Sequence, residues 1–299
     1  IALLDEGNTI PFIARYRKEV TGSLDDSVLR TLDEKLTALR NLAQRKQEVQ
    51  DLIGAQGKLT EEVRAAIERA ATVTEVDDIY RPFRPKRKTR ASVARERGLE
   101  DLAILLFAQE KSYTPSIEEQ AARFVDPERE VPDVAAALQG AMDIVAEEVS
   151  DNADYRRELR RLTFDAGSLT SKAAKEEDSV YAMYYDFSEP LRKLPGHRIL
   201  AINRGEKEEF LKVALTVPED VVLGYLYNRV LSGNRSPAEP YVREAVTDAY
   251  NRLIAPSIER EIRNDLFDTA CEGAIKVFSD NLGHLLMQPP LKGKVVLGF

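Results

Sequence analysis

The chain has 299 residues, enough for one large domain or two ordinary ones. Its 43% hydrophobic and 31% charged residues exclude a disordered or collagen-like chain, and its net charge of -8 argues against a uniformly basic nucleic-acid binder. A single cysteine, Cys271, excludes an internal disulfide framework, and no apolar run reaches the roughly 20 residues of a membrane helix. We therefore expect a reducing, cytoplasmic compartment.

The first section of the chain predicts two helices. After Leu24, the residues Leu29, Leu32, Leu36, Leu39 and Ala43 recur at three- and four-residue steps, which is the pattern of one buried helical stripe. Ser23 and Asp26 predict a capping box at its start, and Gly54 predicts its end. Thr60 then predicts the cap of a second helix that ends near Ala70.

A basic segment follows, between Arg81 and Gly98, where eight basic residues accompany the single acidic residue Glu96. Pro82 and Pro85 forbid a continuous helix, so the segment is expected to begin as an extended loop. Such a loop could line a groove for phosphates, because arginine and lysine give salt-dependent affinity for nucleic acid. Its candidate binding residues are Arg81, Arg84, Lys86, Arg87, Lys88 and Arg90.

A structural role for the same segment stands beside this reading. The loop could tie helices together, or it could dock on acidic domains through ion pairs, and its flanking prolines suit a fixed scaffold loop. Tyr80 and Phe83 could stack on bases or could anchor the loop in the core. The sequence leaves both alternatives open.

Three short helices are predicted next, starting at Ser116, at Asp133 and near Asn152, and they resemble a helix-turn-helix arrangement. The last of them carries Arg156, Arg157, Arg160 and Arg161 at spacings that place all four on one side, with apolar residues opposite. This face could lie against a duplex backbone, or it could be an ordinary solvated surface among neighbouring carboxylates.

A β element is predicted from Leu211 to Val217, where apolar and other residues alternate with a period of two. Residues 198–203 are the expected partner strand, which would make one small β-hairpin. A long helical stretch should follow to about Leu286, interrupted at Pro256. The chain opens without methionine and closes on an apolar run, residues 294–299, which we expect to be the first strand of a further domain.

Signals for catalysis are poor. His197 follows Pro195-Gly196 and fits a structural turn better than a catalytic base, and Cys271 fits a small core residue. Neither a phosphate loop nor a dinucleotide fingerprint occurs in the sequence. We therefore expect no enzyme activity, no catalytic residue, no metal site and no cofactor, and we give little weight to a cryptic nuclease.

Several sequence blocks resemble the Tex family of bacterial transcription accessory proteins. The longest begins Gly7-Asn8-Thr9-Ile10-Pro11 and runs through Gly22, and the next spans the start of the basic segment. The matching blocks are residues 7–22, 78–91, 194–198, 203–206, 255–261 and 288–294. They are ordered and spread over nearly the whole chain, so the resemblance is specific.

The resemblance implies an elongated, mostly helical, multidomain protein related to a eukaryotic transcription elongation factor and histone chaperone. In this family a helical N-terminal region precedes an RNase-H-like (YqgF-type) domain, helix-hairpin-helix modules and an S1-like OB-fold that binds nucleic acid. The predicted organisation is a helical core from residues 1–112 and 188–290, a helix-turn-helix-like insert at 113–187, and the start of an RNase-H-like domain at 291–299.

The sequence therefore predicts a mainly α scaffold with a helix-turn-helix-like insert and one small β-hairpin. Its expected partners are nucleic acid (RNA or DNA), RNA polymerase or other transcription proteins, and its own downstream domains. In the first hypothesis the chain adds an auxiliary nucleic-acid-binding surface. In the second it is a protein-docking scaffold without nucleic-acid contact.

Overall fold

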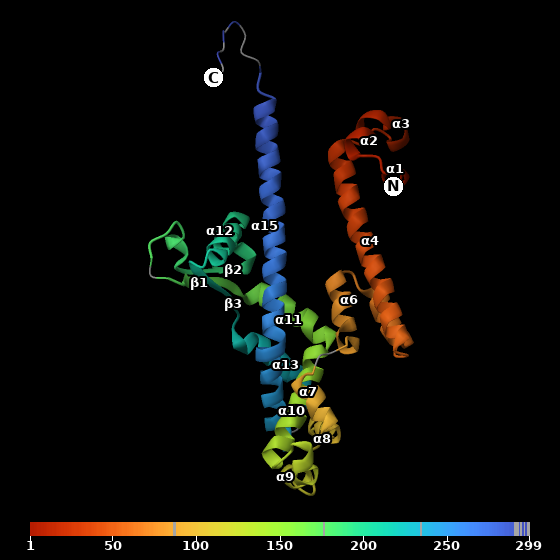
Figure 1. Cartoon of the computed structure of the whole chain (residues 1–299), viewed down its shortest axis with the longest axis vertical. Coiled ribbons are helices and arrows are strands. Elements are labelled where there is room, and N and C mark those ends of the chain that lie inside the picture. Colours follow the sequence, from red (N-terminus) through yellow and green to blue (C-terminus); the bar gives the residue numbers. More distant parts are fainter. Residues whose placement is uncertain are drawn as a thin grey trace. The chain divides into compact units, whose positions relative to one another are not determined.

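The computed structural model of the chain (Figure 1) describes residues 1–85, 88–175, 177–233 and 235–289, together with residues 293, 295 and 297. The chain is mainly helical, as the sequence predicts, and it divides into two compact units. The first unit comprises residues 1–87 with 151–153, and the second comprises residues 88–150 with 154–299. All helices of the described part are too short or too polar to span a membrane.

The first unit is built along one long helix, α4. Its helices are α1 (Ala2–Asp5), α2 (Ile10–Tyr16), α3 (Lys18–Thr21), α4 (Asp26–Ala55), α5 (Glu61–Arg69) and α6 (Val73–Tyr80). The side chain of Asp25, rather than that of Ser23, caps α4 by accepting from the N–H of Val28. Thr60 caps α5 as predicted, by accepting from the N–H of Val63.

The core of the first unit lies at the C-terminal half of α4. Val49 and Ile53 pack there with Ile67 of α5 and Val76 of α6. The predicted apolar stripe of α4 is buried only in part, because Leu39 near its middle is 64% exposed.

The second unit holds the remaining elements. They are α7 (Arg90–Glu96), α8 (Glu100–Ala108), α9 (Ile117–Ala121), α10 (Val134–Asp151), α11 (Ala153–Ala166), β1 (Ser168–Ala173), β2 (Asp186–Pro190), α12 (Gly196–Lys207), β3 (Leu211–Thr216), α13 (Glu219–Val230), α14 (Glu239–Asp248) and α15 (Ala255–Leu286). Their buried residues form one continuous hydrophobic cluster. The helix starts predicted at Ser116 and Asp133 are confirmed, since Ser116 and Glu119 form a capping box on α9 and Asp133 caps α10.

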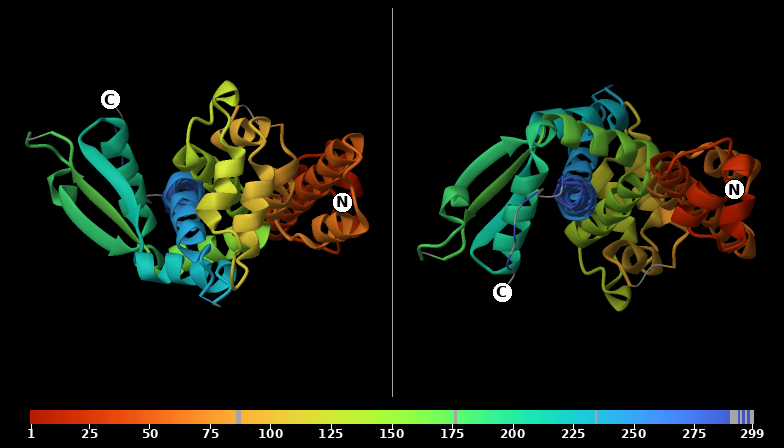
Figure 2. Two further views of the ribbon diagram at one scale, coloured as in Figure 1. Left: turned by 90° about the horizontal axis from the view of Figure 1, so that it is seen from below. Right: turned by 90° about the horizontal axis from the view of Figure 1, so that it is seen from above.

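The β structure is a three-stranded antiparallel sheet in the order β2-β1-β3. The predicted strand Leu211–Val217 is confirmed as β3, but its expected partner is wrong. Residues 198–203 lie in α12, and β3 pairs instead with β1, which places Leu215 opposite Leu169. Figure 2 shows the sheet and α12 on one side of α15, and α12 packs against both β3 and α15.

The predicted interruption at Pro256 is confirmed and has an unusual form. A π-helical turn, Ala249–Ile254, joins α14 to α15, and Pro256 lies in the first turn of α15. Proline lacks the N–H that would donate to the carbonyl of Arg252, so the regular hydrogen-bond ladder cannot pass through this point. The predicted strand at residues 294–299 lies largely outside the described residues, and the predicted division at 113 and 188 stays a prediction.

Candidate nucleic-acid interface

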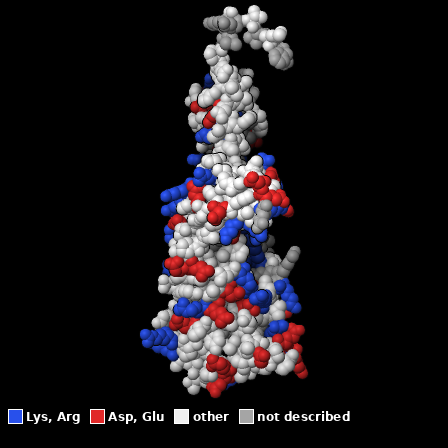
Figure 3. Space-filling view, turned by 90° about the vertical axis from the view of Figure 1, so that its left-hand side faces the viewer, with Lys and Arg blue, Asp and Glu red and all other residues white. Residues whose placement is uncertain are grey.

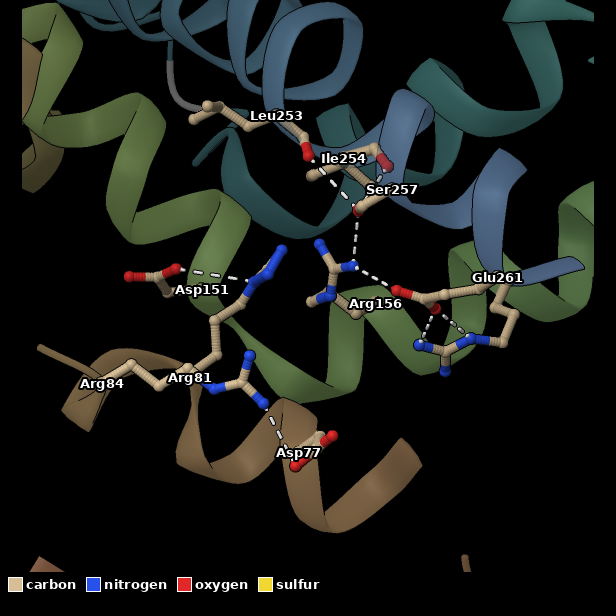
Figure 4. A network of polar contacts seen from close by, with 10 residues as sticks. Asp77, Arg81, Arg84, Asp151, Arg156, Leu253, Ile254, Ser257 and Glu261 are labelled. Atoms are coloured by element: carbon tan, nitrogen blue, oxygen red, sulfur yellow. Dashed lines mark hydrogen bonds and ion pairs between the residues drawn. The ribbon is translucent and has the colours of Figure 1, made fainter. Parts of the chain in front are cut away.

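The basic segment begins in the first unit, with a 3-10 turn directly after α6. Arg84 Nη2 lies 3.1 Å from Asp77 Oδ1, and Arg81 Nε lies 3.9 Å from Asp151 Oδ1 (Figure 4). Both candidate arginines thus have a carboxylate beside them. A guanidinium that is paired in this way offers less positive potential to a phosphate than a free one.

Two aromatic residues fix this part of the loop. The guanidinium of Arg84 lies 5.5 Å from the ring centroid of Tyr80, and that of Arg45 lies 5.9 Å from it. Tyr80 is buried, and Phe83 packs against the same core. These rings anchor the loop, which agrees with the structural alternative for them.

Lys88 and Arg90 lie at the far end of the basic segment, in the second unit. Both are exposed, and the described part of the chain gives neither of them a hydrogen-bond or ion-pair partner. Thr89 between them caps α7, and its hydroxyl donates to Glu147 Oε1 at 3.0 Å. The backbone between them is therefore held, and both side chains reach solvent, although the charge of Arg90 also acts on the carboxyl of Asp143. Lys86 and Arg87 lie outside the described residues.

The arginines of α11 do not share one exposed face. Arg156 is fully buried, which corrects the expectation that all four lie together on one exposed side. Its Nη2 donates to Ser257 Oγ at 2.6 Å and to Glu261 Oε1 at 3.2 Å (Figure 4). Arg160 donates to the other oxygen of Glu261, from Nε at 2.9 Å and from Nη2 at 2.7 Å. Two of the four candidates thus connect α11 to α15 within the core of the second unit.

The other two arginines of α11 lie on the surface among carboxylates. Arg157 donates to Asp154 at 2.7 Å, and Arg161 donates to Glu158 at 2.6 Å and to Asp165 at 2.8 Å. The hydrogen bonds from Arg161 hold the pKa of Glu158 below its ordinary value. Figure 3 shows the same interleaving on one face of the molecule, where Lys and Arg alternate with Asp and Glu rather than gathering in one basic field.

Other residues that the sequence singled out fall into structural positions. His197 lies in the first turn of α12, and Cys271 is half-buried in α15. Within the described ranges, no three His, Cys, Asp or Glu side chains gather as metal ligands would. The sequence reasoning missed Glu261 and Ser257, because nothing local to α11 indicates partners about a hundred residues further along the chain.

Comparison with known proteins places this arrangement in a family. Residues 1–54 match the family model described as Tex-like protein N-terminal domain, and residues 112–278 match the one described as Tex central region-like. The uncharacterized protein YdcI of Bacillus subtilis is 45% identical over 100% of this chain and 42% of its own length.

Two further relatives carry descriptive names. The transcriptional accessory protein Tex of Neisseria gonorrhoeae is 37% identical over 100% of this chain and 40% of its own length. The S1 RNA-binding domain-containing protein 1 of Homo sapiens is 30% identical over 100% of this chain and 31% of its own length. The chain therefore spans less than half the length of these curated relatives.

Proposed function

Because the chain belongs to the Tex family, we propose that it is the helical scaffold of a transcription accessory protein that works with nucleic acid and the transcription machinery. In this proposal the chain holds the other domains of such a protein in place. The protein acts in the cytoplasm, and RNA polymerase is among its partners. The names of two relatives support the setting, since one is a transcriptional accessory protein and one contains an S1 RNA-binding domain.

The observation that carries the scaffold role is the surface of α15. Ile258, Ile262 and Ala270 in its first half are buried in the core, whereas its second half is not covered by the described residues. The exposed apolar residues of that half are Ile275, Val277, Phe278, Leu282, Leu285 and Leu286. Five of these side chains, all except Val277, lie within about 100° of one another around the helix axis. An exposed apolar surface of this kind marks a site of protein interaction.

We propose that the sequence which the relatives carry outside the matched segment packs on this half of α15. The chain covers only 42% of the Bacillus subtilis relative, so that protein has ample further sequence to supply the cover. The charged residues support the same role. Arg156 and Arg160, which the sequence offered as phosphate ligands, pair with Glu261 inside the scaffold.

Hydrogen exchange tests this packing. It is measured on this chain alone and on a chimera in which the chain replaces the matching segment of the full-length Bacillus subtilis relative. Residues 275–286 should gain protection in the chimera, and Phe278→Asp should remove that gain while Glu272→Gln, an exposed neighbour, should not. Equal exchange of these residues in the chain and in the chimera contradicts the scaffold proposal.

A second candidate function is a nucleic-acid contact made by the chain itself. The observation that favours it is the pair of exposed cations Lys88 and Arg90, which make no hydrogen bond or ion pair with the other described residues. They adjoin Lys86 and Arg87 in the sequence, so four basic residues lie within five positions. Phosphates bind to such clusters with an affinity that falls steeply with salt.

Fluorescence anisotropy with labelled single-stranded RNA and duplex DNA across a salt series separates the two functions. The test variant changes Lys86, Arg87, Lys88 and Arg90 to alanine, and the matched control changes the paired arginines Arg157 and Arg161. A scaffold alone should bind no more tightly than about 10⁻⁴ M at physiological salt, and equally in both variants. Tighter, salt-sensitive binding that only the test variant loses would establish the second function.

A further inference from the structure

The second unit contains a cavity of about 580 Å³ to which no function has been assigned above. It lies between α12, α15 and the sheet, to which β1 and β3 each contribute one lining residue. Its apolar lining consists of Leu169, Ile199, Ile202, Val213, Pro256, Leu266 and Phe267. This volume falls within the range of cavities that hold small molecules or peptide side chains.

Half of the six polar residues that line the cavity are basic, and two more are the amides Asn203 and Asn264. Lys207, Arg260 and Arg263 line it, with Glu259 as the single carboxylate. Arg263 is held by ion pairs to Glu206 and Glu259, which fix its position. Lys207 and Arg260 are exposed, and no ion pair joins either of them to another residue in the described ranges. The cavity therefore offers two free positive charges beside an apolar floor.

Val213 of β3 lines the cavity, and β3 is an edge strand of the sheet. The N–H of Ala174 donates to the carbonyl of Phe210, the residue before β3, at 2.8 Å. With the register of the two strands, this means that the even-numbered residues of β3 make the backbone hydrogen bonds to β1. The odd-numbered residues accordingly direct their N–H and C=O groups away from β1. The N–H of Leu215 confirms this, because it donates to Glu259 Oε1 of α15 at 3.0 Å.

Val213 lies two residues before Leu215 and has the same orientation. It lines the cavity, and neither its N–H nor its C=O has a hydrogen-bond partner outside the sheet among the described residues. The free edge at Val213 is short, because Leu215 is already bonded to Glu259 and Leu211 is buried, but an N–H and a C=O that are free at a strand edge can pair with another extended chain. The opposite edge of the sheet is less receptive, because β2 ends at Pro190, which has no N–H.

We propose that this cavity is a docking site for an extended acidic segment of a partner protein, which adds to the edge of β3. The backbone of the segment pairs with Val213, one of its apolar side chains enters the cavity, and its carboxylates pair with Lys207 and Arg260. Strand addition supplies affinity through the main chain, while the pocket and the charges supply specificity. The site is separate from the exposed half of α15 and does not depend on the scaffold role proposed for it.

The probes that test the site are fluorescein-labelled peptides of about six residues, the length of an ordinary strand, in which aspartate alternates with leucine, valine or phenylalanine. Binding to the whole chain is followed by anisotropy. At least one of these peptides should bind, and Lys207→Glu with Arg260→Glu should weaken it about tenfold or more. Lys276→Glu, the same charge change at an exposed position of α15 away from the cavity, should leave binding within about twofold.

Changes to the probe test the strand pairing without any change to the protein. A peptide whose alternate amides are N-methylated cannot pair with a strand edge and should bind about tenfold more weakly or worse. Replacement of aspartate by asparagine should weaken binding and remove its salt dependence. Equal binding of the methylated peptide overturns the proposal, as does no binding of any probe at about 1 mM.

Two other occupants are distinguished in the same experiment. If a short labelled oligothymidylate binds to the site and the peptides do not, the cavity recognises nucleic acid and the proposal is wrong. If the chain alone forms a dimer in sedimentation, and Lys207→Glu with Arg260→Glu dissociates it, a second copy occupies the edge and the proposal is again wrong. A monomeric chain that binds the acidic peptides confirms it.

Discussion

Nη2 of Arg156 lies 2.6 Å from Oγ of Ser257, and this hydrogen bond connects two helices whose residues are about a hundred positions apart in the chain. The hydroxyl of Ser257 also lies 2.9 Å from the carbonyl of Ile254, to which it can donate. Glu261, one turn further along α15, supplies the carboxylate that balances the charge of the buried guanidinium. The contact is therefore a structural element of the second unit.

Glu261→Gln should destabilise the chain by about 3 kcal/mol, because it removes a carboxylate charge that pairs with the fully buried Arg156 and with Arg160. Glu158→Gln is the matched control. It removes a carboxylate from the exposed pair with Arg161 and should cost about 0.5 kcal/mol or less. Urea unfolding of the two variants measures the difference, and equal free energies of unfolding would show that the Arg156 contact adds little to stability.

Titration of Asp143 should lower the free energy of unfolding as the pH rises. Burial raises its pKa above the ordinary 3.8, although the nearby charges of Arg252 and Arg90 act in the opposite direction. The folded state therefore binds more protons than the unfolded state at pH values above 3.8, and the free energy of unfolding decreases as the pH rises through the folded pKa.

Asp143→Asn should remove this decrease, and Arg252 would keep its hydrogen bonds to Asp248. Urea unfolding from about pH 4 to pH 7 measures the effect, and the variant should lose less stability than the wild type over that range. Asp154→Asn, at the exposed partner of Arg157, serves as the control and should follow the wild-type curve. A wild-type slope that persists in Asp143→Asn would assign the titration to another group.

Tyr241 should be among the last tyrosines to ionise. Its hydroxyl donates to Glu118 Oε1 at 2.7 Å, and this hydrogen bond, together with burial, raises its pKa to about 12. Glu118→Gln removes the negative charge and should bring the ionisation to a lower pH. An ultraviolet difference titration reports it, with Tyr241→Phe identifying the transition. An unchanged titration of Glu118→Gln would mean that burial alone sets the pKa.

Gly140→Ala should destabilise the chain although alanine is the better helix former. A Cβ at this position of α10 overlaps Cδ1 of Leu99 and lies 3.3 Å from Cβ of Ala94. Leu99 is buried and has little room to move, so we expect a cost of about 1 to 3 kcal/mol.

Gly224→Ala is the matched control for that substitution. No atom lies within 4 Å of a Cβ built at this position of α13, so the change should stabilise the chain by up to about 1 kcal/mol. Thermal or urea unfolding measures both variants. Opposite signs for the two substitutions are the expected result, and a stabilising Gly140→Ala would show that Leu99 can repack.

Local signals in the sequence predicted much of the helical structure. Thr60, Asp133 and the pair Ser116 and Glu119 act as caps because a side-chain oxygen and an orphan N–H lie within three residues of each other. The partner of β3 could not be found in this way. β1 is a short, polar strand, Ser168–Ala173, that alternates weakly in sequence, so the pattern favours the nearer apolar residues 198–203 as the partner.

The same limit explains the error at Arg156. Helical periodicity separates polar from apolar residues, and a charged residue is therefore assigned to the solvent face. Arg156 is buried because Glu261 and Ser257 accept its hydrogen bonds from another helix, and no pattern within α11 contains that information. The pairing of Arg84 with Asp77 differs, since both residues lie within one short stretch and the charges could have been matched from the sequence.

The π-helical turn Ala249–Ile254 sets the angular phase of all the side chains that follow it. Each residue of a helix turns the next by about 100°. Deleting one residue from this turn would keep α15 intact as a helix but would rotate its faces by that angle relative to α14. Ser257 and Glu261 would swing away from α11, and Glu259 would leave the edge of β3. The π-helical turn thus sets the rotation of α15 about its axis, and both the contacts of the buried Arg156 and the lining of the cavity depend on that rotation.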